Sequence, residues 1–321
     1  MLDLTAPAYK DWLHVNVFDF ASRRVALVNV SLHGDPVAPT SLAAGAFLLG
    51  DLERGWRRHV EVVSAADAVV GSGDLAVEDV AAIALDEASG GVVIRGRLPD
   101  GSVVLEASAT PAAERIVAER PTPFGSGWIA WRAIPRLHAT VWLRVDDELL
   151  AGEEAAAYHD HNWGRWYWGD DAGWEWGAFL SPDGSTFVTT RPTDRGHQAG
   201  TIEFRAEVGG RARSFGGRTV RTDAGGALAE PLGRVPGAMA ALHTGRARPR
   251  LPSVVSFVAD DGYDRVELDA SLVHAAQIVV AEPVRPGYGF IHELLGTFRY
   301  RARIGGVEAE GEGLAAFERV D

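Results

Sequence analysis

The most distinctive stretch of the chain is Tyr158–Trp176, which reads YHDHNWGRWYWGDDAGWEW. Within nineteen residues it holds five of the ten tryptophans, two of the ten histidines and four carboxylates. No other part of the sequence combines so much aromatic surface with so many titratable side chains. We therefore expect the functional residues of the chain to lie in this stretch.

The beginning of this stretch is expected to be a β-strand whose two faces differ chemically, because successive side chains of a strand point to opposite sides. One face carries two imidazoles and an indole, from His159, His161 and Trp163. The other face carries a carboxyl group between a phenol and an amide, from Asp160, Tyr158 and Asn162. The sequence leaves open which of the two faces meets a ligand.

Asp160 is the leading candidate for a catalytic acid. Burial among aromatic side chains disfavours the charged form of a carboxyl group and raises its pKa, so such a group can hold a proton near neutral pH and donate it. Protonation of an alkene requires an acid of this kind. Glu175, which lies between two tryptophans in the sequence, is a weaker second candidate. The alternative is a hydrogen-bond network of His, Asp and Asn that only supports a corner of a sheet.

His159 and His161 are further catalytic candidates, and their shared face raises the question of a metal. Imidazoles are common zinc ligands, but a catalytic zinc site needs a third protein ligand, which the sequence does not nominate. We therefore predict no metal site at these histidines.

The four tryptophans that follow are spaced as two same-face pairs, Trp166 with Trp168 and Trp174 with Trp176. The intervening Gly169–Gly173 is typical of a turn that folds one pair back against the other. Indole faces stabilise nearby positive charge, and four of them exceed what ordinary core packing requires. We interpret these residues, together with Tyr158, Asn162 and Trp163, as the lining of a hydrophobic binding pocket.

Around this stretch, alternating β-branched and aromatic residues broken by Gly, Asp and Pro predict antiparallel β-structure. Pro99-Asp100-Gly101 and Pro182-Asp183-Gly184 predict hairpin turns. Ala65–Val70 and Ala76–Ala84 fit short helices and short strands equally well, and Thr222–Arg250 is expected to be a long loop with room for a short helix at 237–242. The clearest predicted strands are Trp12–Phe20, Arg24–Ser31, Gly91–Gly96, Ser102–Ser108, Ala139–Val145, Thr186–Thr190, Thr201–Val208, Val254–Val258, Phe298–Ile304 and Val307–Phe317.

The composition excludes several classes of function. A net charge of −13 disfavours nucleic acid as a partner, because neutralising phosphates needs a basic face. The chain has no cysteine, so disulfides, thiolate metal sites and cysteine nucleophiles are all excluded. No basic and apolar leader opens the sequence, and no run reaches the roughly 18 apolar residues of a membrane span. We therefore expect a cytoplasmic protein without a membrane span.

Two segments carry a resemblance to a known family: YHDHNWG at Tyr158–Gly164 and GWEWGAFLSPDGSTFVTTRPTDRG at Gly173–Gly196. They resemble the hydroxyneurosporene synthase (carotenoid hydratase) family of lipocalin-like proteins. In that family an Asp-His motif precedes a Trp-x-Trp strand, an Asp-Gly turn and a strand that ends in arginine. The resemblance spans about Trp128–Gly196, while the flanking regions match only as generic β-structure.

The resemblance implies an all-β fold of two consecutive lipocalin-like domains, which we place at residues 1–182 and 183–321. It also implies a hydratase, or a cyclase of terpene or Diels–Alderase type, that acts on a polyene or terpenoid without a redox cofactor. The alternative is a binding protein that holds such a hydrophobic ligand without chemistry. Among the lone histidines, His292 is expected to face the cavity, because Tyr288 and Phe290 share its side of a strand.

Overall fold

The computed structural model describes residues 9–35, 38, 40–71, 73–77, 79–86, 88–198, 200–228, 233–234, 251–282 and 287–321. Within these ranges the chain forms β-strands and two short 3-10 helices, Ala65–Asp67 and Gly217–Thr219. The predicted all-β class is therefore confirmed. In the part of the chain so described, no helix is long and apolar enough to cross a membrane.

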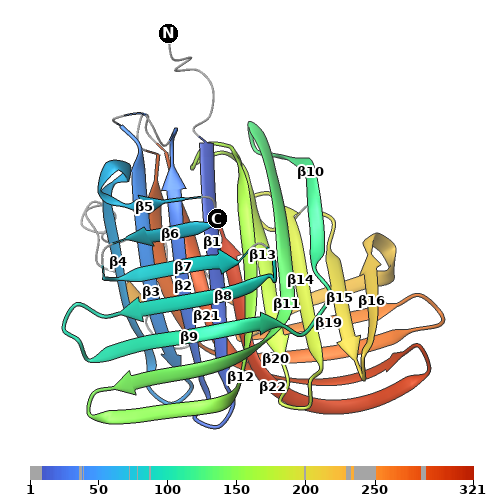
Figure 1. The fold of residues 1–321 in the computed structure, drawn as a ribbon. Coiled ribbons are helices and arrows are strands. Elements are labelled where there is room, and N and C mark those ends of the chain that lie inside the picture. Colours follow the sequence, from blue (N-terminus) through green and yellow to red (C-terminus); the bar gives the residue numbers. More distant parts are fainter. Residues whose placement is uncertain are drawn as a thin grey trace.

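The first sheet has twelve strands and occupies the N-terminal half of the chain (Figure 1). Its strand order is β4-β3-β2-β1-β12-β11-β9-β8-β7-β6-β5, and β10 pairs with β11. The strands are β1 Tyr9–Asp19, β2 Arg24–His33, β3 Leu42–Asp51, β4 Gly55–Ser64, β5 Val69–Val70, β6 Asp74–Val77, β7 Ala81–Asp86, β8 Gly91–Arg97, β9 Val103–Pro111, β10 Ile116–Phe124, β11 Gly127–Val145 and β12 Glu148–Arg165.

The second sheet has ten strands and follows in the order β16-β15-β14-β13-β22-β21-β20-β19-β17, with β18 beside β20. The strands are β13 Gly173–Leu180, β14 Thr186–Thr193, β15 Glu203–Val208, β16 Arg211–Gly216, β17 Val220–Gly225, β18 Gly233–Arg234, β19 Val254–Asp260, β20 Arg265–Ala281, β21 Tyr288–Ile304 and β22 Val307–Val320. Two curved sheets side by side match the expected pair of lipocalin-like units (Figure 1).

The turns that the sequence predicts connect neighbouring antiparallel strands. Gly101, between β8 and β9, has φ +68°, and Gly184, between β13 and β14, has φ +96°. A residue with a Cβ rarely adopts such positive φ angles, which explains glycine at both positions. Of the two ambiguous segments, Ala65–Val70 combines a 3-10 turn with β5, and Ala76–Ala84 covers parts of β6 and β7.

Hydrophobic cores lie within each sheet and between the two sheets. One lies inside the first sheet, where β6 and β7 pack across β2 and β3, and one lies inside the second sheet. The third core joins the outer faces of both sheets and includes Phe18, Leu48, Tyr158, Trp176 and Leu295. Strand β1 contributes to the first and third cores, and therefore every residue from 13 to 18 is buried.

The chain changes sheets within residues 166–172, between Arg165 and Gly173. Strand β13 thus pairs with β14 and β22, and the predicted boundary at residue 182 falls in the hairpin after it. That boundary stays a prediction. The segment expected as a loop, Thr222–Arg250, begins within β17, and its stretch 235–250, with the optional helix, lies outside the described residues.

Candidate active site

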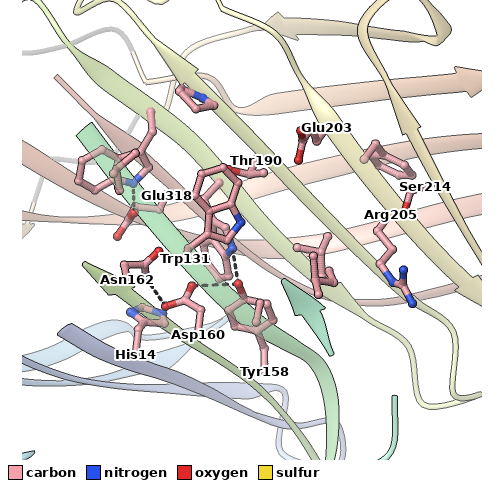
Figure 2. A pocket seen from close by; sticks show the side chains of 18 of the residues that line it. His14, Trp131, Tyr158, Asp160, Asn162, Thr190, Glu203, Arg205, Ser214 and Glu318 are labelled. Carbon is pink, nitrogen blue, oxygen red and sulfur yellow. Dashed lines mark hydrogen bonds between the residues drawn. The ribbon is translucent and has the colours of Figure 1, made fainter. Parts of the chain in front are cut away.

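A cavity of about 400 Å³, here called the main cavity, lies between the two sheets. The first sheet contributes Trp12, His14, Trp131, Tyr158, Asp160 and Asn162 to its lining. The second sheet contributes Trp174, Trp176, Val188, Thr190, Phe204, Phe215 and Glu318. Figure 2 shows labelled side chains of both sheets around this space, among them Tyr158, Asp160, Thr190 and Glu318. The volume falls in the range of about 300–1,000 Å³ that is typical of small-molecule sites.

Asp160 owes its place in this cavity to the register of three strands. Strand β12 runs between β1 and β11, so that Asp160 has His14 as one cross-strand partner and Ala133 as the other. Directly paired residues point to the same face of a sheet. The cavity face of β12 is therefore the one that carries Tyr158, Asp160 and Asn162.

The Asp160 carboxylate is held by hydrogen bonds from its own strand. Its Oδ2 accepts from the Tyr158 hydroxyl at 2.9 Å, and its Oδ1 accepts from Asn162 Nδ2 at 2.5 Å. The Tyr158 hydroxyl in turn accepts from Trp176 Nε1 at 3.0 Å, which ties β12 to β13 (Figure 2). These contacts fix the orientation of the carboxyl group and leave a chain of polar atoms along an otherwise aromatic wall.

Burial raises the pKa of Asp160 to about 6, although His14 and the hydrogen bonds from Tyr158 and Asn162 oppose the rise. The residue is 7% exposed, so desolvation of the charged form is the dominant cause. A carboxyl group with this pKa is partly protonated near neutral pH. Such a group can donate a proton and take one back, and the raised pKa agrees with the expectation from the sequence.

Two further carboxyl groups, those of Glu318 and Glu293, lie close to Asp160 on the second sheet. Glu318 of β22 lines the main cavity and accepts a hydrogen bond from Trp174 Nε1 (Figure 2). Glu293 of β21 is its cross-strand partner and is 4% exposed. Burial raises the pKa of Glu293 well above its usual value, and the neighbouring carboxylates of Glu318 and Asp160 raise it further. Both effects favour the protonated form of Glu293.

The other face of β12 points away from the main cavity. His159 Nδ1 contacts the His14 carbonyl at 2.9 Å, and burial lowers the pKa of His159 to about 3. His161 Nε2 lies 2.7 Å from Asp11 Oδ1, and its ring packs against Trp163 at 4.9 Å. These three side chains support the β1–β12 pairing, and we propose no catalytic or substrate-binding role for them.

The sequence predicts two same-face strand pairs of tryptophans joined by a turn, but only the second pair lies in a strand. Trp166 and Trp168 lie in the connection after β12, whereas Trp174 and Trp176 belong to β13. The turn does fold the first two back, because Trp174 lies 6.5 Å from Trp166 and 6.0 Å from Trp168 between ring centroids. Trp174 and Trp176 line the main cavity, whereas Trp166 is 1% exposed and belongs to a core with Phe124.

Glu175 is held in an ion-pair cluster outside the main cavity. Its Oε2 lies 3.1 Å from Arg191 Nη1, and its Oε1 lies 3.3 Å from His197 Nδ1. Burial acts to raise the pKa of Glu175, but His197, Arg191 and Arg319 outweigh it and lower the pKa below its usual value. A carboxylate stabilised in this way is a poor proton donor, so the expectation of a second acid at this position is not supported.

His292 shares a face of β21 with Tyr288 and Phe290, as expected, but that face does not line the cavity. It is fully buried, with Nε2 3.0 Å from Gln277 Nε2 and Nδ1 3.3 Å from the Arg319 carbonyl. The strand instead directs Ile291 and Glu293 toward the space between the sheets. The prediction that His292 faces the cavity is therefore wrong, and its sequence neighbour Glu293 takes that position.

Five site residues have no distinctive signal in the sequence: Trp12, His14, Trp131, Glu293 and Glu318. Each lies in a strand that reads as ordinary scaffold, and Trp12 and Trp131 become neighbours of Asn162 only through pairing across 150 and 31 residues. A search for acids within buried strands would have found Glu293 and Glu318. Within the ranges that the structure describes, no three His, Asp or Glu side chains are arranged to hold a metal ion.

The raised pKa of Asp160 predicts a pH-dependent stability. The folded protein binds this proton more tightly than the unfolded chain, so the stabilisation is complete below the unfolded pKa of 3.8 and is lost as pH rises through about 6. Relative to an Asp160→Asn variant, the wild type should lose about 3 kcal/mol of unfolding free energy between about pH 4 and pH 8. Urea unfolding at a series of pH values measures this difference, and a difference that stays constant would contradict the assignment.

Several solved structures share this fold. A protein from Nitrosomonas europaea, named as an AttH protein, superposes with a TM-score of 0.65 at 14% identity, over 98% of this chain and 92% of that one. Kievitone hydratase from Nectria haematococca superposes with a TM-score of 0.62 at 14% identity, over 98% and 91% of the two chains. CghA gives a TM-score of 0.57 at 15% identity, over 98% and 88%.

These likenesses confirm the all-β architecture of two lipocalin-like units, over nearly the whole chain, that the family resemblance implies. One of the neighbours is a hydratase by name, and CghA has also been solved with Sch210972. No protein-family model matches the sequence, and no curated protein matches it.

Proposed function

We propose that the protein is a cofactor-independent hydratase or cyclase that protonates a carbon–carbon double bond of a hydrophobic polyene or terpenoid. The observation that carries this proposal is the buried carboxyl group of Asp160, with a pKa of about 6, in a cavity walled by indoles. The hydratase among the structural neighbours agrees with it. The substrate is a small hydrophobic molecule, because the lining of the main cavity is mostly aromatic and aliphatic.

The reaction begins when protonated Asp160 transfers its proton to one alkene carbon. The π electrons form the new C–H bond, which leaves a carbocation on the substrate and a carboxylate on Asp160. The indole faces of Trp131, Trp174 and Trp176 lower the energy of this cation through their negative quadrupole. Water then attacks the cation and returns a proton to Asp160, or a second double bond attacks, closes a ring and loses a proton to the same carboxylate.

Comparison of metabolites from strains with and without the protein tests this proposal and identifies the substrate at the same time. We expect a strain that lacks the protein to accumulate a hydrophobic alkene, and the purified protein to convert this compound. The product is heavier by one water if the protein is a hydratase and has the same mass as the substrate if it is a cyclase. An Asp160→Asn variant should bind the compound and convert it much more slowly.

A protein that only binds its ligand, or that acts on another class of substrate, would give different results. If the purified protein binds the accumulated compound but the product ratio is the same with and without it, the enzyme is excluded and a binding protein for a hydrophobic ligand remains. If no hydrophobic compound changes in abundance, the substrate class is wrong.

A Tyr158→Phe variant should shift the pH profile of the reaction. The hydrogen bond from Tyr158 stabilises the Asp160 carboxylate, so its removal should raise the pKa of Asp160 by about one unit. Because the protonated acid is the active form, kcat/KM should fall above about pH 6 in the wild type and above about pH 7 in the variant.

A Val188→Ala variant is the control for this shift, because it alters the cavity wall without touching the hydrogen bonds. It should change KM and leave the midpoint of the pH profile in place. An unshifted midpoint in Tyr158→Phe would show that Asp160 is not the titrating acid.

A further inference from the structure

A second cavity of about 210 Å³, here called the tail cavity, adjoins the main cavity between the sheets. Strands β1–β4 form one of its sides, with Leu27, Ala44, Ala46 and Val60 among the lining residues, and β20 and β21 form the other. The two cavities share three lining residues: Trp12, Trp174 and Glu318. The tail cavity therefore begins where the main cavity ends.

The partition between the cavities is a pair of indoles. Trp12 and Trp174 stack with their ring centroids 6.1 Å apart and their planes 16° from parallel. One belongs to the first sheet and the other to the second, and the hydrogen bond of Trp174 to Glu318 fixes its orientation. Neither indole is fully buried, because each has one surface toward a cavity.

The small size of the tail cavity indicates that it extends the main cavity and is not a separate binding site. Sites for whole small molecules usually measure about 300–1,000 Å³, and the tail cavity alone falls below that range. A ligand that occupies both cavities has to extend past the edge of the Trp12–Trp174 stack. Such a path suits a linear molecule better than a compact one.

Two titratable groups of the tail cavity have pKa values shifted toward their neutral forms. Burial, together with the charge of Lys10, lowers the pKa of His33 to about 4, so its imidazole is uncharged near pH 7. Burial beside other carboxylates raises the pKa of Glu293 and favours its neutral form. Neutral groups cost much less to leave without water than charged ones. Glu318, at the end shared with the main cavity, keeps its hydrogen bond from Trp174 when an apolar ligand segment displaces water from the rest of this cavity.

We propose that the tail cavity is the second compartment of the substrate site and takes the apolar end of an elongated ligand. The reacting double bond of the same ligand lies beside Asp160 in the main cavity. This inference rests on the proposed function for the identity of the reacting end. It adds that the substrate is a linear molecule long enough to pass the Trp12–Trp174 stack.

Two neutral fluorescent probes of different length test this compartment by binding alone. Diphenylhexatriene is a linear polyene that can occupy both cavities, whereas N-phenylnaphthylamine is compact and fits within the main cavity. An Ala44→Phe variant fills the tail cavity from β3. It should weaken binding of diphenylhexatriene at least about tenfold, the equivalent of two or more methylene groups kept out of an apolar site, and leave N-phenylnaphthylamine unchanged.

A second variant of the tail cavity and a matched control variant accompany this test. Val62→Trp adds bulk at a lining residue that is 56% exposed, where folding tolerates it, and should reproduce the loss. Ala224→Phe makes the same change as Ala44→Phe on an exposed position of β17 away from both cavities and should affect neither probe. Thermal melting confirms that each variant is folded.

Three results would overturn the proposal. In the first, the two cavity variants bind both probes as tightly as the wild type does. In the second, both probes lose affinity for these variants to the same extent. In the third, the number of N-phenylnaphthylamine molecules bound falls from two in the wild type to one in the cavity variants. The readout does not involve turnover. Full turnover in Asp160→Asn with selective probe binding intact would therefore overturn the proposed function alone. Loss of turnover in Asp160→Asn without selective probe binding would overturn this inference alone.

Discussion

An Asp160→Asn variant is expected to turn over its substrate about 10²–10⁴-fold more slowly than the wild type, the range that a positioned general acid contributes. The substitution removes the transferable proton and keeps the shape of the side chain. Asn162 can rotate its amide to accept a hydrogen bond from the new NH₂ group, so the contacts with Tyr158 and Asn162 can be retained. Substrate affinity should change little, and steady-state kinetics with a binding titration separates the two effects.

A variant of Glu175 shows whether the loss of turnover is specific to Asp160. A Glu175→Gln variant tests the other acid that the sequence nominates, and we expect it to retain turnover because Glu175 lies in an ion pair with Arg191 outside the main cavity. Full turnover in Asp160→Asn, together with loss of turnover in Trp176→Ala, would contradict acid catalysis. Such a pair of results would favour a pocket that only holds a polyene in a reactive conformation.

A Lys10→Met variant is expected to lose about 3–5 kcal/mol of unfolding free energy, the usual cost of leaving one partner of a buried ion pair uncompensated. Lys10 is the only lysine of the chain and is fully buried. Its Nζ donates to the Trp166 carbonyl at 2.5 Å and lies 3.3 Å from Glu282 Oε2. It also lies 5.1 Å from the Trp166 ring centroid.

This ammonium group joins the two sheets at the point where the chain passes between them. Lys10 belongs to β1, whereas Glu282 follows β20 and also accepts a hydrogen bond from the Trp168 amide. Urea unfolding measures the loss. The double variant Lys10→Met with Glu282→Gln should recover much of it, because both charges are then removed together.

An exposed ion pair provides the control for this effect. Arg301 and Glu310 are 79% and 76% exposed with 3.4 Å between their charged atoms, so Arg301→Met should leave the unfolding free energy nearly unchanged. If Lys10→Met is as stable as Arg301→Met, the buried pair does not hold the sheets together.

The strands and turns of this protein could be predicted because their signals are local. The alternation of Phe298–Ile304 gives buried aromatic residues opposite exposed arginines, as observed in β21. The two Pro-Asp-Gly turns join adjacent strands for the same reason. The pairing of β1 with β12 is not local, because it connects residues about 150 positions apart and depends on packing of the whole sheet.

The candidate site also combines features that the sequence predicts locally with features that depend on the packing of the whole fold. Periodicity alone separated the Asp160 face of β12 from the His159 face, but the choice between them needed the position of the second sheet. His14 and Glu318 approach Asp160 only through strand pairing and sheet packing, so no spacing in the sequence indicates them. The expectations for Glu175 and His292 failed because an ion pair and a strand face, respectively, turn these side chains away from the main cavity.

Transfer of a proton from Asp160 to carbon is the central claim, and the reaction in heavy water tests it most directly. Asp160 exchanges its proton with solvent, so the product formed in D₂O should carry one deuterium bonded to carbon at the position that was protonated. Mass spectrometry and NMR of the product detect this label. A product without carbon-bound deuterium, formed at the usual rate, would contradict protonation of the double bond.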